Sequence, residues 1–478
     1  MKTVFVLTFP IISHLNAILN VINELVQSHH IKVVTYGLQK HKQLVLKTGS
    51  EFRAYENFDE YNNDHVTANT RLEMTAPVIH NLLNLTNMNL LKIALEIDQE
   101  KPQLILFDVM SFHAKWIFKY LDTNHERFVK NQKSYLLTSS ATPMTLSFST
   151  TFAHEINIYP EDKVIEEIYE ASTSAKFFSF FSITKALIRV KMLSNKFKID
   201  YKLPKDLKTI HHEIFFNTKN CRTLVFTIPE IQPEAQLMSE NVKYVGICLN
   251  ENLRTTEQRL TIETPSDVKF LLDKFKPLNP TNSYSDLLSE DNRRLFFVSL
   301  GTLFNNELEP YLKIIEAIRL YNSQSGEKLY SIISTGQKCY DQLEMLISSK
   351  NLILKNDTIL VPSAPQIEIL KRASLFLTHA GYGSIHEALY FGVPMIAMPI
   401  SADQPLNAQH LEKILKVCIR IDYKSSKSVE IKDTIEKILT NSSYHQNCLK
   451  YSKLLRNCNG AEYAADEIVN SYLQNSQN

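Results

Sequence analysis

Residues 375–390 read LFLTHAGYGSIHEALY, and this stretch indicates the fold. Leu375–Leu377 form an apolar run typical of a buried parallel strand, and the spacing of Ile385 and Leu389 predicts an amphipathic helix. The segment His379–Ser384 between them holds two glycines and predicts a tight turn. Such a turn exposes the amides of the helix N-terminus, where the helix dipole favours an anion such as phosphate.

A second turn of the same type lies at 299–302, between the apolar run 295–298 and another helical pattern. The hydroxyls of Ser299, Thr302 and Ser384 can add hydrogen-bond donors to the two turns. Either turn alone is explained equally well as a plain connection, but two in one domain favour a pyrophosphate. No GxGxxG or GxxxxGK[ST] follows a predicted strand, so neither a dinucleotide site nor a P-loop is supported.

Apolar runs and helical stretches alternate along most of the chain, which predicts two doubly wound α/β domains. The predicted strands are Val4–Leu7, Ile31–Tyr36, Leu104–Phe107, Tyr135–Leu137 and Leu224–Phe226, then Leu295–Val298, Leu329–Ile333, Ile359–Val361, Leu375–Leu377 and Met395–Met398. The pattern loosens from Gln232 to Asp291, which predicts a connection with a partly structured insertion. Two such domains are expected to face each other at the carboxyl ends of their strands, with a ligand in the cleft.

The composition is that of an ordinary globular protein. Of 478 residues, 44% are hydrophobic and 22% charged, which excludes a disordered chain, a collagen and a coiled coil. Lys+Arg minus Asp+Glu is 52 − 51 = +1, so no overall field attracts nucleic acid or anionic lipid.

Cysteine usage and hydropathy predict the compartment. The six cysteines form no CxxC, which favours a reducing environment over a disulfide framework or a zinc ribbon. The run Met1–Pro10 lacks a cleavage site and is better explained as a first strand than as a signal peptide. No window approaches the roughly 18 apolar residues of a membrane span. We expect a cytoplasmic protein without a membrane anchor, monomeric or weakly dimeric.

His14 and Asp108 are the candidate catalytic pair. His14 lies just beyond the first predicted strand, and Asp108 ends the apolar run 104–107, so both belong at strand ends in one domain. A carboxylate beside an imidazole orients it and supports the imidazolium once a proton is taken. The alternatives are a structural histidine and a helix N-cap aspartate.

The stretch from residue 364 to 408 resembles the donor signature of the UDP-glycosyltransferases (glycosyltransferase family 1). The matching segments are Ala364-Pro365-Gln366, Thr378 to Ser384, Glu387-Ala388-Leu389, Gly392-Val393-Pro394-Met395, Asp403-Gln404 and Asn407-Ala408. Further matches are Phe9-Pro10 to His14, Leu106 to Ala114, Tyr244-Val245-Gly246 and Val298 to Thr302. The HAGxGS form is similar to the soluble macrolide glycosyltransferases rather than to the membrane-anchored animal glucuronosyltransferases.

The resemblance implies a GT-B fold, with two Rossmann-like domains and a C-terminal helix that crosses back to the N-terminal domain. It implies inverting transfer from a UDP-sugar to a small acceptor, without a metal or other cofactor. The implied domains are an acceptor domain at 1–235, a linker and insertion at 236–294, a donor domain at 295–455 and the returning helix at 456–478.

The resemblance also implies a role for each matching residue. His14 matches the general base and Asp108 its partner, while Glu387 matches the carboxylate that takes the ribose hydroxyls. The donor-binding positions on the phosphate side are Ser299, Gly301, Thr302, His379, Gly381, Gly383 and Ser384. Gln366 matches a position beside the uracil, next to Ser363 and Ala364, and Asp403 and Gln404 match the pair that holds the sugar hydroxyls.

Three positions depart from the family pattern. Many members stack a tryptophan on uracil where this chain has Ser363, and the only tryptophan here is Trp116. Tyr382 and Gly383 replace the Trp-Asn pair of the plant members.

We therefore expect an inverting hexosyltransferase that uses UDP-glucose and a lipophilic hydroxylated acceptor such as a phenolic, flavonoid-like or other xenobiotic compound, in a detoxification role. Gln404 favours glucose by resemblance, and the apolar acceptor rests on the 25 Phe and 21 Tyr. The alternative is a non-catalytic sugar-nucleotide binder on the same fold, although such a binder has no need of His14 and Asp108. A retaining enzyme would carry a second glutamate eight positions after Glu387, where this chain has Met395.

Overall fold

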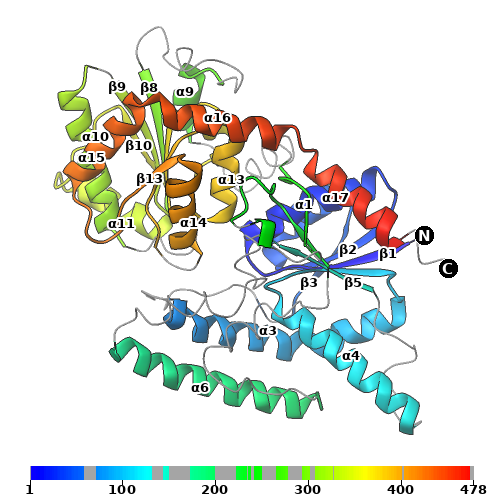
Figure 1. Ribbon diagram of the computed structural model, residues 1–478. Helices are drawn as coiled ribbons and strands as arrows, with labels where there is room; N and C mark the ends of the chain where they lie inside the picture. Colours follow the sequence, from blue (N-terminus) through cyan, green and yellow to red (C-terminus); the bar gives the residue numbers. More distant parts are fainter. Residues whose placement is uncertain are drawn as a thin grey trace. The chain divides into compact units, whose positions relative to one another are not determined.

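The computed structural model describes residues 2–56, 58, 71–131, 144–149, 173–199, 222–233, 235–237, 242–249, 265–277, 293–301, 307–326, 328–400 and 403–473. The chain divides into two compact units: unit 1 holds residues 1–248 and 459–478, and unit 2 holds residues 249–458. Each unit has its own parallel sheet and its own core (Figure 1).

Seven strands form the sheet in the described part of unit 1, in the order β3-β2-β1-β4-β5-β6-β7, and all neighbours are parallel. Their bounds are β1 Thr3–Leu7, β2 Lys32–Gly37, β3 Glu51–Ala54, β4 Leu104–Asp108, β5 Met144–Ser149, β6 Thr223–Val225 and β7 Val242–Tyr244. The strand order reverses between β1 and β4. The carboxyl ends at such a switch point are where open α/β sheets hold their ligands.

Helices cover both faces of this sheet. Their bounds are α1 Ile12–Gln27, α2 Lys42–Lys47, α3 Arg71–Glu100, α4 Phe112–Asn131, α6 Thr173–Lys196 and α17 Gly460–Ile468, with short turns at Gln39–His41, Ala235–Leu237 and Val469–Leu473. α1 and α17 lie on one face and α3 and α4 on the other, with α6 packed outside α3 (Figure 1).

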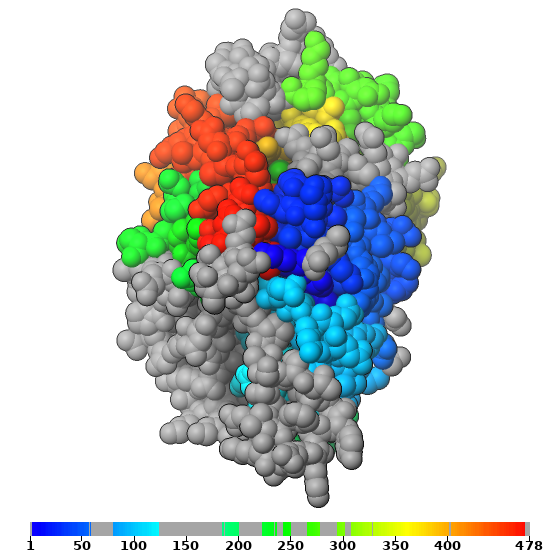
Figure 2. All heavy atoms as spheres, turned by 90° about the vertical axis from the view of Figure 1, so that its right-hand side faces the viewer, coloured from blue at the N-terminus to red at the C-terminus, as the bar shows by residue number. Residues whose placement is uncertain are grey.

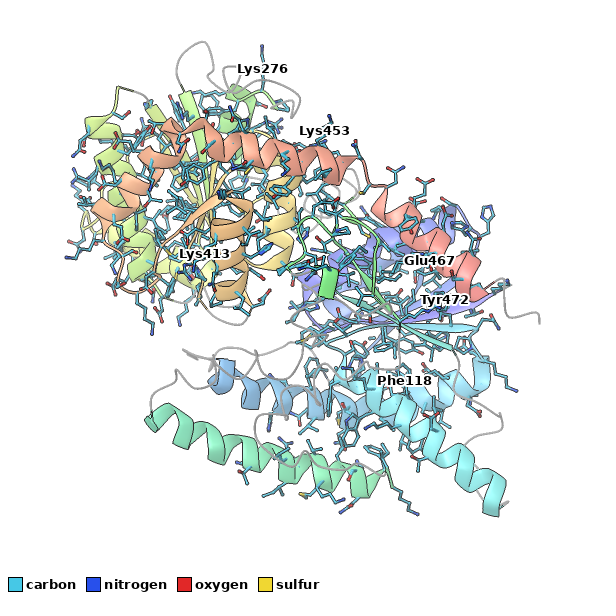
Figure 3. All side chains as sticks on the ribbon, viewed as in Figure 1. Phe118, Lys276, Lys413, Lys453, Glu467 and Tyr472 are labelled. Carbon is cyan, nitrogen blue, oxygen red and sulfur yellow. The ribbon has the colours of Figure 1, made fainter. Side chains whose placement is uncertain are left out.

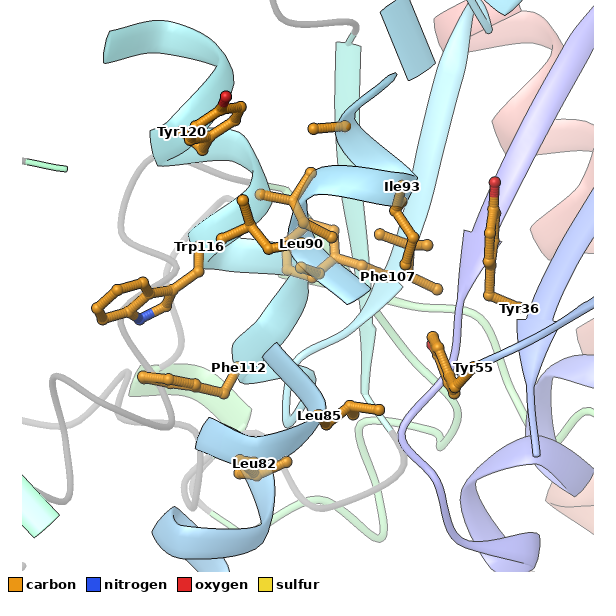
Figure 4. Close-up of a cluster of buried hydrophobic side chains, with 14 of the residues drawn as sticks. Tyr36, Tyr55, Leu82, Leu85, Leu90, Ile93, Phe107, Phe112, Trp116 and Tyr120 are labelled. Atoms are coloured by element: carbon orange, nitrogen blue, oxygen red, sulfur yellow. The ribbon is translucent and has the colours of Figure 1, made fainter. Parts of the chain in front are cut away.

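The core of unit 1 packs aromatic side chains of β2, β4 and α4 against aliphatic side chains of α3 (Figure 4). Trp116 is buried on α4, with its ring centroid 5.4 Å from that of Phe112. Phe107 at the end of β4 meets Phe118 edge to face at 5.1 Å. Rings pack large apolar areas with few rotatable bonds, so this layer holds α4 firmly against β4.

The C-terminal helix α17 returns to unit 1, as the expected fold class requires. Gly460 begins this helix beside the strand-end backbone, and a Cβ at that position would lie 2.3 Å from the Ile247 carbonyl oxygen. Lys243 pairs with Glu467, and His29 Nε2 lies 3.1 Å from Asp466 Oδ1. Figure 2 shows the red C-terminal atoms against the blue N-terminal atoms, and Figure 3 labels Glu467 on α17.

Six strands form the sheet in the described part of unit 2, in the order β10-β9-β8-β11-β12-β13, again all parallel. Their bounds are β8 Arg293–Ser299, β9 Lys328–Ser334, β10 Thr358–Val361, β11 Leu375–Thr378, β12 Met395–Ala397 and β13 Cys418–Arg420. The switch point of this sheet lies between β8 and β11. Phe297 and Phe376 stack there with centroids 5.0 Å apart and fasten the two strands together.

The helices of unit 2 follow the strands in the expected alternation. Their bounds are α9 Ser266–Lys274, α10 Glu309–Gln324, α11 Gln337–Ser348, α12 Gln366–Leu370, α13 Tyr382–Tyr390, α14 Gln404–His410 with a π turn at Leu411–Leu415, α15 Ser428–Thr440 and α16 Ser442–Arg456. α13 packs against α16, and α10 packs against α15.

Nine of the ten predicted strands are present within one or two residues of the expected bounds, and the prediction of two doubly wound parallel sheets is confirmed. The tenth, Tyr135–Leu137, lies outside the described residues. Two elements fall within 236–294, the range assigned to the linker: β7 extends the sheet of unit 1, and α9 belongs to unit 2. The bounds of the four implied segments stay a prediction.

Candidate functional site

The switch point of unit 1 brings His14 and Asp108 together. His14 lies in the first turn of α1, directly after β1, and Asp108 is the last residue of β4. His14 Nδ1 is 2.8 Å from Asp108 Oδ2, with the aspartate fully buried and the histidine side chain 19% exposed. When Nδ1 donates its hydrogen to the carboxylate, Nε2 is left as the basic nitrogen. The pair can therefore accept a proton from a hydroxyl group.

Asp108 also shapes the turn that follows β4. Its second oxygen, Oδ1, accepts a hydrogen bond of 2.8 Å from the Met110 amide, and its carbonyl accepts one of 2.8 Å from Ser111. α4 begins only at Phe112, so Asp108 is not the N-cap of this helix. One carboxylate oxygen holds the backbone while the other faces His14, which fixes the direction of the carboxylate.

A second buried pair, Tyr55 and His113, was not found from the sequence. Tyr55 Oη donates to the Thr8 carbonyl at 2.7 Å and lies 2.9 Å from His113 Nε2. Burial raises the pKa of Tyr55, and the nearby charge of Asp108 adds to this rise. Burial lowers the pKa of His113 to about 3, so its ring is neutral near pH 7. Because Tyr55 already donates to Thr8, His113 Nε2 is the donor of the pair.

The switch point of unit 2 brings the two glycine turns together around His379. A Cβ on Gly301 would lie 2.8 Å from His379 Cε1 and Nε2, and a Cβ on Gly381 would lie 2.4 Å from Nε2. The ring therefore fits only because both neighbours are glycines. Gly301 also has φ +85°, a conformation that L side chains rarely adopt.

His379 is a neutral hydrogen-bonding group. Desolvation lowers its pKa to about 4, although a hydrogen bond to the Ser299 backbone opposes the shift. Its Nδ1 has no hydrogen-bond partner among the described residues. The N-cap of α13 is Gly381, so the first amides of this helix follow directly, and the exposed Gly383 leaves open space beside them. The first amides of α13 lie at a helix N-terminus and can bind an anion through hydrogen bonds.

Gln366, Ser384 and Glu387 form one network in unit 2. Gln366 Nε2 donates to Glu387 Oε2 at 2.5 Å and lies 3.5 Å from Ser384 Oγ. The three residues come from the start of α12 and from α13. Glu387 is 8% exposed, so its carboxylate is held in one direction by partners rather than by water.

Asp403 and Gln404 lie where α14 begins. Gln404 is buried, and its Oε1 accepts a hydrogen bond of 2.9 Å from the Ile400 amide. Asp403 Oδ2 accepts one of 2.8 Å from Asn407 Nδ2. Gln404 is thus anchored to the β12–α14 connection, and Asp403 to α14 itself.

The structure therefore brings together most of the predicted site residues of each unit. Ser363 is exposed and Ala364 buried in the loop between β10 and α12. Thr302 lies outside the described residues. The role assigned to each residue stays a prediction.

The part of the chain that the structure describes has no group of three or more His, Cys, Asp or Glu side chains placed to hold a metal ion. Among the described helices, none combines the length and the apolar character needed to cross a bilayer.

The sequence is similar to those of known sugar transferases. Residues 329–458 match the family model described as "UDP-glucoronosyl and UDP-glucosyl transferase". The whole chain is 24% identical to the uncharacterized UDP-glucosyltransferase YojK of Bacillus subtilis (strain 168), over 100% of this chain and 99% of that protein.

Solved structures show the same fold. The glycotransferase of kitacinnamycin is similar with a TM-score of 0.67 at 18% identity, over 98% of both chains. Os79 from O. sativa in complex with UDP has a TM-score of 0.63 at 16% identity, over 97% of this chain and 99% of that one. At these identities the likeness concerns the fold alone.

Proposed function

We propose that the chain is a UDP-glycosyltransferase, because residues 329–458 match that family model and the whole chain is 24% identical to a UDP-glucosyltransferase. It moves a hexose, with glucose favoured, from a UDP-sugar to a hydroxyl of a small lipophilic acceptor, with inversion at C1. The observation that carries the proposal is the 2.8 Å contact between His14 Nδ1 and the buried Asp108. This contact leaves a basic nitrogen at the carboxyl end of β1, where the transfer needs one.

The proposed reaction is a single displacement. His14 Nε2 takes the proton of the acceptor hydroxyl as its oxygen forms a bond to C1 of the sugar. The bond from C1 to the phosphate oxygen breaks with its electron pair, and UDP leaves. Asp108 stabilises the imidazolium that results. Attack from the face opposite UDP turns an α-linked donor into a β-linked product.

We assign the leaving diphosphate to unit 2. The first amides of α13, beside the His379 ring, would donate hydrogen bonds to the growing negative charge. Glu387 would take the ribose hydroxyls, since a carboxylate accepts two hydrogen bonds as a cis-diol requires. Gln366 would lie beside the uracil, and Asp403 and Gln404 would hold the sugar.

The proposal is tested by product detection. The protein is incubated with UDP-glucose, UDP-galactose, UDP-glucuronate or UDP-N-acetylglucosamine and a panel of phenols, with and without EDTA, and the products are analysed by mass spectrometry. A hexose-shifted product that survives EDTA is the expected result. Measurable UDP binding with no product from any donor would instead support the non-catalytic binder.

A single methyl group at position 381 is expected to weaken UDP binding by about tenfold, roughly 1.4 kcal/mol. In Gly381→Ala the new Cβ would overlap His379 Nε2 at 2.4 Å and displace the ring. The φ of Gly381 is −70°, so alanine causes no backbone strain there and the effect is confined to the imidazole. Isothermal titration calorimetry with UDP measures the change.

The matched control is Gly326→Ala. A Cβ at Gly326 meets nothing within 4 Å, so this variant is expected to bind UDP like the wild type. Equal UDP affinity of Gly381→Ala and the wild type would remove His379 from the donor site.

A further inference from the structure

Asn407 is a fully buried amide on α14 that connects two parts of unit 2. Its Nδ2 donates to the Ala380 carbonyl at 3.1 Å and to Asp403 Oδ2 at 2.8 Å. Two acceptors on the same side identify this atom as the nitrogen, and so fix the orientation of the amide.

The oxygen of this amide, Oδ1, makes no hydrogen bond to the described residues, although it is buried. A buried acceptor without a partner costs free energy, so packing alone would favour an apolar side chain at this position. The contribution of Asn407 therefore lies in its nitrogen.

The carbonyl that this nitrogen holds belongs to a strained residue. Ala380 has φ +61°, a left-handed conformation in which its Cβ crowds the backbone. Its own amide donates to Thr378 Oγ1 at 3.3 Å, so both the amide and the carbonyl of Ala380 are hydrogen-bonded. Ala380 stands between His379 and Gly381, the N-cap of α13. Its conformation therefore sets the direction of both the imidazole and the helix N-terminus.

We propose that Asn407 is a positioning residue for the nucleotide site. By holding the Ala380 carbonyl it keeps this residue left-handed, and so presents His379 and the first amides of α13 to the diphosphate. Asn407 itself does not touch the nucleotide. The inference rests on the proposed function, because it assumes that these groups bind UDP.

A double-mutant cycle separates this role from simple packing. Asn407→Ala is expected to weaken UDP binding about tenfold in the wild-type background, as a loss of about 1.4 kcal/mol would. In the Ala380→Gly background the same change is expected to weaken it less than about threefold, since glycine adopts positive φ without strain. Calorimetric titration with UDP of the wild type and the three variants gives both ratios.

Thermal unfolding of the same four proteins supplies the second readout. Packing around α14 is lost in both backgrounds, so Asn407→Ala is expected to lower the melting temperature in both, whereas the large loss of UDP affinity is expected only where residue 380 is alanine. Asn407→Asp replaces the donor by an oxygen that faces the Ala380 carbonyl and Asp403, so it is expected to bind UDP more weakly than Asn407→Ala.

Asn322 offers a matched control within unit 2. Its side-chain amide also grips backbone, with Nδ2 2.9 Å from the Leu329 carbonyl and Oδ1 2.9 Å from the Leu329 amide. Leu329 lies at the amino end of β9, whereas the glycine turns follow the carboxyl ends of β8 and β11. Asn322→Ala is therefore expected to lower stability and leave UDP affinity unchanged.

Two results would overturn the inference: wild-type UDP affinity in Asn407→Ala, or an equal loss of affinity in both backgrounds. Failure of the wild type to bind UDP at all would refute the proposed function first, and this inference with it. An Asn322→Ala variant that lost UDP affinity as Asn407→Ala does would show that any loss of an amide in this unit suffices, which also contradicts a specific role.

Discussion

Replacement of His14 by alanine is expected to lower the rate of sugar transfer by about a thousandfold while UDP binding stays close to that of the wild type. A positioned general base typically contributes 10²–10⁴-fold, roughly 3–5 kcal/mol of the barrier. His14 lies in unit 1 beside Asp108, whereas the residues proposed to bind UDP all lie in unit 2. Initial rates at saturating donor and a calorimetric titration with UDP measure the two effects separately.

His30→Asn is the matched control for His14→Ala. His30 is an exposed histidine of the same unit with φ +55°, a conformation that asparagine tolerates. This variant is expected to keep full activity. If His14→Ala retained substantial transfer to several acceptors, another group would have to be the base.

Replacement of Glu387 by alanine is expected to weaken UDP and UDP-sugar alike by about 10–100-fold, or roughly 1.4–3 kcal/mol. The change removes a carboxylate that is 8% exposed and leaves Gln366 Nε2 without its 2.5 Å partner. Loss of one member of a buried polar network costs more than loss of an exposed charge. Calorimetric titration with both ligands measures the change.

Comparison of UDP with 2′-deoxy-UDP tests the ribose role directly. The wild type is expected to prefer UDP, and Glu387→Ala is expected to lose that preference because the acceptor of the 2′-hydroxyl is gone. Glu309→Ala, which removes a glutamate that is 75% exposed in the same unit, is expected to change neither affinity. A variant that still discriminated fully between the two nucleotides would place the ribose elsewhere.

The sheets could be predicted because their central strands are buried on both faces. β1 and β4 are continuous apolar runs for this reason, and so is β11. Four strands of the described sheets were missed: β3, β5, β7 and β13. Of these, β3, β7 and β13 have three or four residues each, and all three lie at the ends of their sheets. β3 and β7 are also only partly buried, so they carry no comparable signal.

Most candidate site residues of unit 2, from Ser363 to Gln404, could be predicted as a group because they fall within about 45 consecutive positions of one motif. Ser299 and Gly301 belong to the separate glycine turn after β8. The contacts within the motif could not be predicted, since the hydrogen bond from Gln366 to Glu387 joins positions 21 apart through the packing of α12 on α13. The hydrogen bond from Asn407 to the Ala380 carbonyl likewise depends on the positive φ of Ala380, which no sequence pattern shows.

The pair Tyr55 and His113 lacked any such motif. The two residues are 58 positions apart: Tyr55 follows β3, His113 lies in the first turn of α4, and the Thr8 carbonyl that Tyr55 also contacts follows β1. A lone histidine on the apolar face of a helix is more often a core residue than a functional one, so the sequence offered no reason to single out His113.

The central claim is a single displacement with His14 as the base, and the anomeric configuration of the product tests it most directly. The glucoside formed from UDP-glucose is purified, and the coupling constant of its anomeric proton is measured by NMR. The large diaxial coupling of a β-glucoside is the predicted result. The small coupling of an α-linked product would contradict the account, because retention requires a second displacement or a front-face mechanism that one base at His14 does not supply.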